Sequence, residues 1–424
     1  MIAVCVRKPR KNGLGLAWAH RDEPAMEPKW GVLTATTCPR QTARARIFVM
    51  GPNVRAEKRS SHEAGTEYDR RMLDWKLSHR DAVGMPVAIL VWVVLLTALG
   101  AAWFGCKQQD RRQVVVYVSV DQAHAEPVLA AFERARGIEV LPVYDVEANK
   151  AAGLARRILA ERSHPRADVF WNGELVQTLM LSRSGVLAAY RSPSASDLPS
   201  DFVDPSGLWA GCAGRVRVFV MPSALAPDRQ PSSIWDLAGD KAAPNEIGLS
   251  IPLFGTSATH AAALYAEVGP ERARTFYETI KHKGVRIADG NSTVRDLVVQ
   301  GKLQFGMVDT DDACEAVRRG ANIRTVAPDQ AEGSLGALVI PTTVAVVLGG
   351  PHPQEAKALV DFLLSPEAER LLVASGWSHA PARSHDVAPR CFSFPDLRRM
   401  RLDTGRLADM VDRSREDMRA VFLR

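Results

Sequence analysis

The chain has 424 residues, of which 46% are apolar, 24% charged and 7% aromatic. This is the composition of an ordinary globular protein, which excludes a fibrous or wholly disordered chain. The formal net charge of +6 would suit an acidic partner such as nucleic acid, but the charge is unevenly spread. Residues 1–84 hold 16 Lys and Arg against 9 Asp and Glu, whereas residues 85–424 hold 38 against 39. We therefore expect no nucleic-acid partner.

A single apolar stretch separates these two parts. No residue between Asp81 and Lys107 is charged, and Thr97 is the one clearly polar residue among these 25. A helix of about 20 apolar residues crosses a bilayer core, so the stretch can span a membrane. Basic residues at 70–80 favour a cytoplasmic N-terminal side, which predicts a periplasmic or other extracytoplasmic location for the rest. No second stretch of this length follows, which excludes a transporter with many spans.

The N-terminal part divides at Met72. Residues 1–71 show no sustained periodicity, and we expect them to be disordered or to precede the true start of the product. Residues 72–106 have the order of an export signal: basic positions, an apolar run and then Gly105-Cys106. Cys106 is a candidate for lipidation. An uncleaved membrane anchor and an ordinary cleaved signal peptide are the alternatives.

From residue 114 the sequence predicts alternating strands and helices. β-branched or apolar runs indicate strands, and segments of helical period lie between them. The predicted strands are 114–119, 139–144, 168–171, 215–221, 247–250, 285–288, 304–308 and 342–348. The predicted helices are 123–136, 147–162, one ending at Leu181, 259–268, 294–300, 313–319, 353–364 and 366–374. This order predicts an α/β fold with parallel strands, in two lobes over residues 107–391, followed by a helical tail at 392–424.

Common enzyme signatures are absent from the sequence. It contains no GxSxG elbow, no GxxxxGK[ST] loop, no HExxH and no GxGxxG. We therefore expect a binding protein rather than an enzyme, with no cofactor.

Small polar residues gather where predicted strands end. Ligands of parallel α/β folds bind at the carboxyl ends of strands, where helix N-termini present free N–H groups that suit phosphate, sulfate or carboxylate. The alternative is that these hydroxyls only cap their helices. The candidate ligand-binding residues are Ser119, Asp121, Asn172, Glu174, Gly255, Thr256, Ser257, Thr259, Asn291, Ser292 and Thr293.

Three carboxylates follow the predicted strand 304–308. Asp309, Asp311 and Asp312 can bind a hard cation, pair with an amine or with sugar hydroxyls, or simply begin a helix. We expect Asp309 and Thr310 to contact the ligand. Asp309 and Asp311 are the weaker candidates for a metal site.

Two arginines alternate with apolar residues in the strand 215–221. Alternation places Arg215 and Arg217 on one face of that strand. They can meet an anion, pair with the carboxylates at 309–312, or form a solvated strand face.

Six cysteines are scattered at positions 5, 38, 106, 212, 314 and 391. No pair has CxxC spacing, so the sequence does not support a zinc ribbon or thioredoxin-type chemistry. One disulfide among the exported cysteines is possible, and unpaired buried thiols are the alternative.

Several segments together resemble bacterial extracellular solute-binding proteins of ABC importers, with the ferric-iron type as the nearest branch. They are the run from VYVSVDQAH to RRILAE, then ADVFWNGE, LFGTSATHAAALYAEVGPERA, DGNSTVRDLVVQGKLQFGMVDTDDA and LLSPEAERLL. The resemblance covers about residues 113–385. It implies a type II periplasmic-binding-protein fold, in which strands cross between two lobes that close on a small ligand.

Only some of the ligand-binding residues that the resemblance implies are present in this chain. Iron-binding members place adjacent tyrosines after the strand that matches 305–308, where this chain has Asp309-Thr310-Asp311. Members also carry a carboxylate near the place of Glu174 and hold an anion with a loop resembling 255–257. Other relatives bind phosphorylated sugars or phosphonates, which the anion loops fit better.

The sequence therefore predicts an extracytoplasmic receptor for a small anionic solute, such as a phosphorylated sugar or a phosphonate. Its partners would be that solute and an ABC permease in the inner membrane, with a membrane or lipid anchor. The alternatives are a ferric-iron or iron-chelate binding protein, a membrane-anchored sensor or interaction module of the same fold, and an exported metal-dependent hydrolase.

Overall fold

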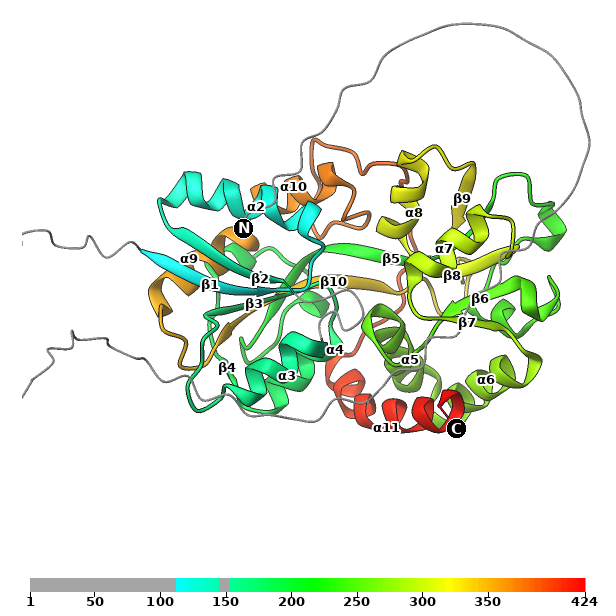
Figure 1. Ribbon diagram of the computed structural model, residues 1–424, viewed down its shortest axis with the longest axis horizontal. Helices are drawn as coiled ribbons and strands as arrows, with labels where there is room; N and C mark the ends of the chain where they lie inside the picture. The colour runs from blue at the N-terminus through cyan, green and yellow to red at the C-terminus, as the bar shows by residue number, and fades with distance from the viewer. Residues whose placement is uncertain (1–111, 145–151, 424) are drawn as a thin grey trace, which may run out of the picture. The chain divides into compact units, whose positions relative to one another are not determined.

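The computed structural model describes residues 112–144 and 152–423 (Figure 1). The predictions for residues 1–71, for the apolar stretch and for Cys106 lie outside these residues. Within them, no helix is both long and apolar enough to cross a membrane.

The described residues form an α/β structure. The strands are β1 (Gln113–Val118), β2 (Glu139–Tyr144), β3 (Val169–Asn172), β4 (Leu187–Ala188), β5 (Ala210–Pro222), β6 (Ile247–Ser250), β7 (Arg286–Ala288), β8 (Phe305–Asp309), β9 (Ile323–Val326) and β10 (Val339–Val347). The helices are α2 (Gln122–Arg136), α3 (Ala152–Ala160), α4 (Val176–Arg183), α5 (Gly255–Val268), α6 (Pro270–Lys283), α7 (Asn291–Val299), α8 (Thr310–Arg318), α9 (Pro353–Leu363), α10 (Pro366–Ser375) and α11 (Thr404–Phe422). Short 3-10 turns include η5 (Ile234–Ala238).

The predicted strands and helices are present with shifted ends, and residues 147–151 of the predicted helix 147–162 lie outside the described residues. β2 and β6 have the predicted bounds, whereas β5 begins at Ala210, five residues before the predicted strand. α6, β4 and β9 were not among the predicted elements. α6 carries its buried Ala273, Phe276, Tyr277 and Ile280 at helical spacing, so its period was present in the sequence.

Two strands join two parallel groups into one sheet. The strand order is β2-β1-β3-β10-β5-β8-β6-β7. β1 is parallel to β2 and β3, and β6 is parallel to β7 and β8, whereas β10 and β5 are antiparallel to their neighbours. The first half of β5 pairs with β10, and residues 217–220 pair with β8. β5 and β10 are therefore the crossing strands that the family resemblance implied (Figure 1).

The crossing strands divide the structure into two lobes. Lobe 1 contains β1–β4 with α2, α3, α4, α9 and α10, and lobe 2 contains β6–β9 with α5–α8. α11 packs mainly on α5 and α6 of lobe 2 and also touches α4 of lobe 1.

The two faces of the sheet are covered differently. On one face a continuous core runs beneath both lobes and includes Phe170 of β3, Phe219 of β5 and Phe305 of β8. On the other face each lobe has its own core, with Trp171 in that of lobe 1 and Val218 in that of lobe 2. Neighbouring residues of one strand enter different cores because side chains alternate between faces. The lobes thus share one core and are separate on the opposite face.

A pair of glycines lets α7 lie close to the sheet. Gly248 of β6 and Gly306 of β8 are opposite each other in the parallel ladder. A Cβ on Gly306 would lie 2.3 Å from Cγ1 of Val294 and 3.0 Å from the carbonyl oxygen of Gly248. The missing side chains let α7 pack close to the sheet, so that its N-terminus lies beside the ends of β6 and β8.

We expect Gly306→Ala to lower the free energy of unfolding by about 1–3 kcal/mol, because the added methyl group overpacks the contact with Val294. Urea denaturation of the purified protein measures the loss. Gly290→Ala is the matched control, since Gly290 has extended backbone and open space around its Cα. An equal stability change in both variants would contradict the packing explanation.

Candidate functional site

A polar cavity of about 160 Å³ lies between the lobes. It is at the carboxyl ends of β1, β3, β6 and β8, as expected for a parallel α/β fold. Lobe 1, β5 and the segment after α10 supply Ser119, Asp121, Gly173, Glu174, Arg215 and Trp377. Lobe 2 supplies Ser250, Ile251, Phe254, Gly255, Thr256, Ser257, Asp289, Gly290, Asn291, Ser292, Asp309, Asp311 and Asp312. We call this cavity the cleft.

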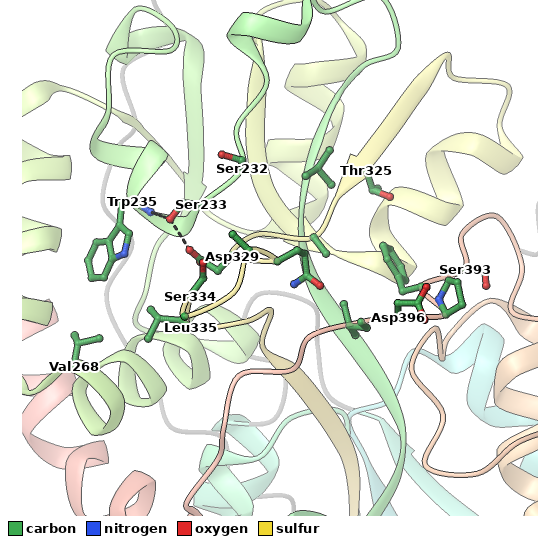
Figure 2. Close-up of a pocket in the computed structure, with 18 of the residues that line it drawn as sticks. Ser232, Ser233, Trp235, Val268, Thr325, Asp329, Ser334, Leu335, Ser393 and Asp396 are labelled. Atoms are coloured by element: carbon green, nitrogen blue, oxygen red, sulfur yellow. Dashed lines mark hydrogen bonds between the residues drawn. The ribbon is translucent and has the colours of Figure 1, made fainter.

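A larger groove of about 870 Å³ lies on lobe 2 and is drawn in Figure 2. Its buried carboxylate, Asp329, already accepts hydrogen bonds from Ser233 Oγ (2.5 Å) and from the Ile234 N–H (3.0 Å). Within the described residues, none that line this groove has a buried side-chain N or O without a partner. In the cleft, by contrast, Arg215 Nε and Asp311 Oδ1 are buried without one. The cleft is therefore the better candidate despite its smaller volume.

Arg217 of β5 connects three elements at the floor of the cleft. Its guanidinium is fully buried and donates to Asp309 Oδ1 at the end of β8 (2.9 Å) and to Asn291 Oδ1 in α7 (3.0 Å). It also donates to Ser257 Oγ (3.2 Å) and Thr256 Oγ1 (3.4 Å) in α5. The N-termini of α5 and α7 are thus held to the end of β8 by one side chain.

The second arginine lies nearer to the cavity. Arg215 Nη1 is 3.0 Å from Asp311 Oδ2 and 3.2 Å from Asp309 Oδ2. Its guanidinium carbon is 4.2 Å from the centre of the Trp377 ring, a cation–π contact. Arg215 also donates to the carbonyl oxygen of Gly173. Of the three roles left open for the two arginines, pairing with the carboxylates is confirmed, and the solvated strand face is wrong.

The carboxyl groups of Asp309, Asp311 and Asp312 differ in how readily they ionise. Burial disfavours the ionised form of Asp309, but Arg217 and Arg215 more than offset this and hold its pKa below the usual value. Burial, with the nearby Asp309 charge, raises the pKa of Asp311 to about 6 even though Arg215 opposes the shift. Burial and the charges of Asp311 and Asp309 raise the pKa of Asp312 well above its usual value. The two arginines therefore do not balance all three carboxylates.

Most of the predicted site residues line the cleft. These are Ser119, Asp121, Glu174, Gly255, Thr256, Ser257, Asn291, Ser292, Asp309 and the metal candidate Asp311. Gly255 has a φ of +55°, a left-handed conformation that glycine adopts without strain, where the chain turns into α5. The oxygen ligands of Asp309, Asp311 and Asp312 lie within 4.8 Å of one another.

Four predicted residues do not line the cleft. Asn172 is fully buried and donates to the backbone oxygen of Glu174 (2.6 Å) and to Thr178 Oγ1 (3.0 Å). Thr310 Oγ1 accepts from the Val216 N–H (3.2 Å), and the Thr259 hydroxyl donates to Glu174. Thr293 lies on α7 beyond the cavity wall. The side chains at these four positions do not line the cavity, because proximity to a strand end does not determine which side chains face it. The backbone N–H of Thr293 lies in the first turn of α7.

Glu174 lines the cleft, but its carboxylate is used by the protein. Its oxygens accept from the Val176 N–H (2.6 Å), the Gln177 N–H (2.9 Å) and Thr259 Oγ1 (2.8 Å). Burial raises the pKa of Glu174, although these hydrogen bonds oppose the shift. Glu174 therefore caps the start of α4 and bonds lobe 1 to α5 of lobe 2.

The capping alternative fails for the two serines. Neither Phe254 at the start of α5 nor Gly290 at the start of α7 is joined to its helix by a side-chain cap. Ser257 lies inside α5, accepts from Arg217 and bonds to Ser250. Ser292 lines the cleft.

Trp377, Phe254 and Asp312 are lining residues that were not among the predicted contacts. Trp377 comes from the segment after α10 and donates through Nε1 to Thr342 Oγ1 (2.8 Å). No sequence signal ties it to the loops on the other lobe. Asp312 was visible in the run 309–312, of which only the first members were selected. Among the described tyrosines, none lines the cleft, consistent with the absence of a tyrosine pair after β8.

One disulfide lies within the part of the chain that the structure describes. Cys314 in α8 pairs with Cys391, and their Cα atoms are 5.5 Å apart. Cys212 in β5 is a buried free thiol. The sequence did not assign this pair, whose members are 77 residues apart.

We expect Arg217→Met to lower the free energy of unfolding by about 3–5 kcal/mol, because Asp309 would lose its shorter buried ion pair and keep only the contact with Arg215 at 3.2 Å. Adding Asp309→Asn should recover part of the loss. Arg229→Met, at an exposed pair with Glu246, is the matched control and should cost at most about 1 kcal/mol. Chemical denaturation measures all three changes, and a small effect of Arg217→Met would contradict the role of this pair.

We expect His260 of α5 to make folding sensitive to acid. Burial, and then the Arg217 charge, lower its pKa to about 3. Between an unfolded pKa of about 6.5 and pH 3 the unfolded chain binds the proton more readily, so stability falls as pH falls through that window. Between pH 7 and pH 5 the free energy of unfolding should therefore fall by about 2 kcal/mol less in His260→Gln than in the parent. Denaturation at both pH values measures it, with His282→Gln at an exposed site as control; parallel curves for His260→Gln and the parent would refute the assignment.

Comparison with known sequences identifies the family. A family model described as bacterial extracellular solute-binding protein matches residues 114–378. A putative 2-aminoethylphosphonate-binding periplasmic protein of Salmonella typhimurium is 26% identical over 287 residues, which are 65% of this chain and 80% of that protein. The major ferric iron-binding protein of Neisseria meningitidis serogroup B is 26% identical over 268 residues, which are 62% of this chain and 78% of that protein.

Solved structures share the fold. Iron-bound HitA from Pseudomonas aeruginosa has a TM-score of 0.65 at 23% identity, over 73% of this chain and 99% of HitA. AfuA from Actinobacillus pleuropneumoniae, with fructose-6-phosphate bound, has a TM-score of 0.63 at 21% identity, over 74% of this chain and 99% of AfuA. The crossing strands, the cleft at the strand ends and the family match agree, and the chain belongs to the bacterial extracellular solute-binding proteins.

Proposed function

We propose that the chain is the periplasmic receptor of an ABC importer for a small solute with an anionic phosphonate or phosphate group at one end and a protonated amine at the other. The observation that carries the proposal is the polarity of the cleft. The cleft is lined both by two helix N-termini and by carboxylates that the arginines do not fully balance, among them Asp311 with its unpartnered Oδ1. Binding, not catalysis, is the proposed activity, and membrane or lipid anchoring remains part of the proposal.

The anionic end of the solute would lie against α5 and α7. The Ala258 N–H donates to the Phe254 carbonyl (3.2 Å) and the Val294 N–H to that of Gly290 (3.2 Å), so residues 255–257 and 291–293 precede the helical ladder. N–H groups at such positions, with the positive ends of the helix dipoles, attract anions. The hydroxyls of Thr256 and Ser292 line the same wall. Arg217 is bonded beneath both helix starts and adds positive charge without reaching the solvent.

The cationic end would lie against Asp311 and Asp312. Asp311 Oδ1 is buried without a hydrogen-bond partner, and the Asp311 side chain is only 9% exposed. An ammonium group placed there would donate to that oxygen and favour the ionised form of both carboxylates. A solute with phosphonate alone would leave these groups unpaired, which disfavours its binding.

The relatives support this choice of chemistry. A relative is named for binding 2-aminoethylphosphonate, a phosphonate that carries an amine, and a protein of the same fold holds fructose-6-phosphate. The small volume of the cleft suits a compact solute of this kind.

Ferric iron is the second candidate. Relatives and structural neighbours are named for iron, and the clustered oxygens of Asp309, Asp311 and Asp312 are hard ligands. Against it, Asp309 is already paired with two arginines, and the described tyrosines do not reach the cleft. An iron complex with a phosphate-like anion would also use the helix N-termini, so the experiment must separate the two.

We expect 2-aminoethylphosphonate to raise the melting temperature of the protein, because a ligand at 100 times its Kd adds about 2.7 kcal/mol to the stability of the folded state. Ethylphosphonate, which lacks the amine, should bind about 10-fold or more weakly. Asp312→Asn should remove that preference without abolishing the binding of ethylphosphonate. Isothermal titration calorimetry gives the affinities.

The surface variant Asp228→Asn serves as the control for loss of a carboxylate, since Asp228 is exposed and does not line the cleft. Equal affinity for both phosphonates would refute the amine subsite. Binding of ferric citrate, with no shift by either phosphonate, would favour the iron candidate instead.

A further inference from the structure

The segment Gly376–Leu402 after α10 is a further connection between the lobes. Trp377 at its start belongs to the core of lobe 1. Phe392, Phe394 and Leu397 further along pack against the core of lobe 2. The segment is fixed to the crossing strand β5 where the His379 and Ala380 N–H groups donate to the Gly214 carbonyl (3.1 and 3.0 Å).

The disulfide joins this segment to the helix that carries the acidic wall of the cleft. Cys314 lies two residues after Asp312 in α8, and Cys391 lies in the segment. A Cβ on Gly376 would lie 3.2 Å from Cys314 Sγ, so the sulfur packs against the backbone directly before Trp377. The Arg390 carbonyl is 2.8 Å from His379 Nε2, which holds the neighbour of Cys391 against the same stretch.

Trp377 is therefore held from two sides. Its indole N–H is bonded to Thr342 of β10, and its ring faces the Arg215 guanidinium that pairs with Asp311. The disulfide fixes α8, and with it Asp311, against the backbone next to that ring. Cys314 thus packs against Gly376, the neighbouring Trp377 contacts Arg215, and Arg215 pairs with Asp311 in the first turn of α8.

We propose that the Cys314–Cys391 disulfide is a positioning cross-link of the cleft, which holds Trp377 and Arg215 against the first turn of α8 and so raises the affinity for solute. This proposal rests on the proposed function for its binding readout. Cys314 and Cys391 are positioning residues, because neither lines the cleft.

An added dithiol can open the cross-link by thiol–disulfide exchange. An added dithiol gives two electrons and two protons to the S–S bond, which yields the Cys314 and Cys391 thiols while the reagent becomes its own disulfide. Cys391 is exposed and accessible to attack, whereas Cys314 is buried. Cys212 is a poor exchange partner, because burial raises the pKa of its thiol well above the usual value.

The test compares the oxidised chain, the chain reduced with dithiothreitol and the variant Cys314→Ala/Cys391→Ala, with 2-aminoethylphosphonate as probe. Circular dichroism first shows that each form is folded at the temperature used. We expect loss of the cross-link to weaken probe affinity about 10-fold in the parent chain and by less than about 2-fold when Trp377→Ala is already present. Cys212→Ala, which removes a buried thiol elsewhere, should leave affinity unchanged.

An affinity that stays within about 2-fold on loss of the cross-link, or an equal loss with and without Trp377, would overturn the proposal. If the oxidised chain does not bind the probe, the proposed function is wrong. Amide hydrogen exchange then tests the positioning role of the disulfide by itself. Amides of residues 376–380 and 310–314 should then exchange faster without the cross-link. Unchanged exchange in both stretches would overturn it.

Discussion

The buried contact between Arg217 and Asp309 is the interaction on which the site depends. A guanidinium with no exposure must be paired, and this one meets a carboxylate at the end of β8 together with the starts of α5 and α7. Loss of Asp309 would leave the buried Arg217 without a carboxylate partner, and loss of Arg217 would leave Asp309 with Arg215 alone, so the arrangement is satisfied only when all three elements meet. The same side chain that fixes lobe 2 to the crossing strand therefore lies beneath residues that line the cleft.

The pairing of the arginines with carboxylates is the basis for the choice of the proposed solute. Their positive charge is largely neutralised by Asp309 and Asp311, so an anion would depend on backbone N–H groups and hydroxyls at two helix starts. The acidic side chains that remain favour a positive group on the same solute. This balance supports the proposed solute, a compact molecule with charges of both signs.

Much of this site could be predicted from the sequence, because the patterns that indicate it lie within single segments. Alternation placed Arg215 and Arg217 on one face, and glycine and hydroxyl residues marked the starts of α5 and α7. What failed depends on contacts between distant segments. Thr259 bonds to Glu174 across the lobes instead of lining the cavity, and Trp377 enters it from a segment with no motif of its own. Neither the pattern nor the spacing of single segments contains that information.

The most direct measurement of the proposed function is a crystal structure of the protein grown with 2-aminoethylphosphonate. The phosphonate oxygens should lie within hydrogen-bond distance of the N–H groups at residues 255–257 and 291–293, with the amine next to Asp311 and Asp312. A reversed solute, with its phosphonate on Arg215 and its amine away from these carboxylates, would contradict the assignment of both ends. An empty cleft at saturating solute would contradict the proposed function itself.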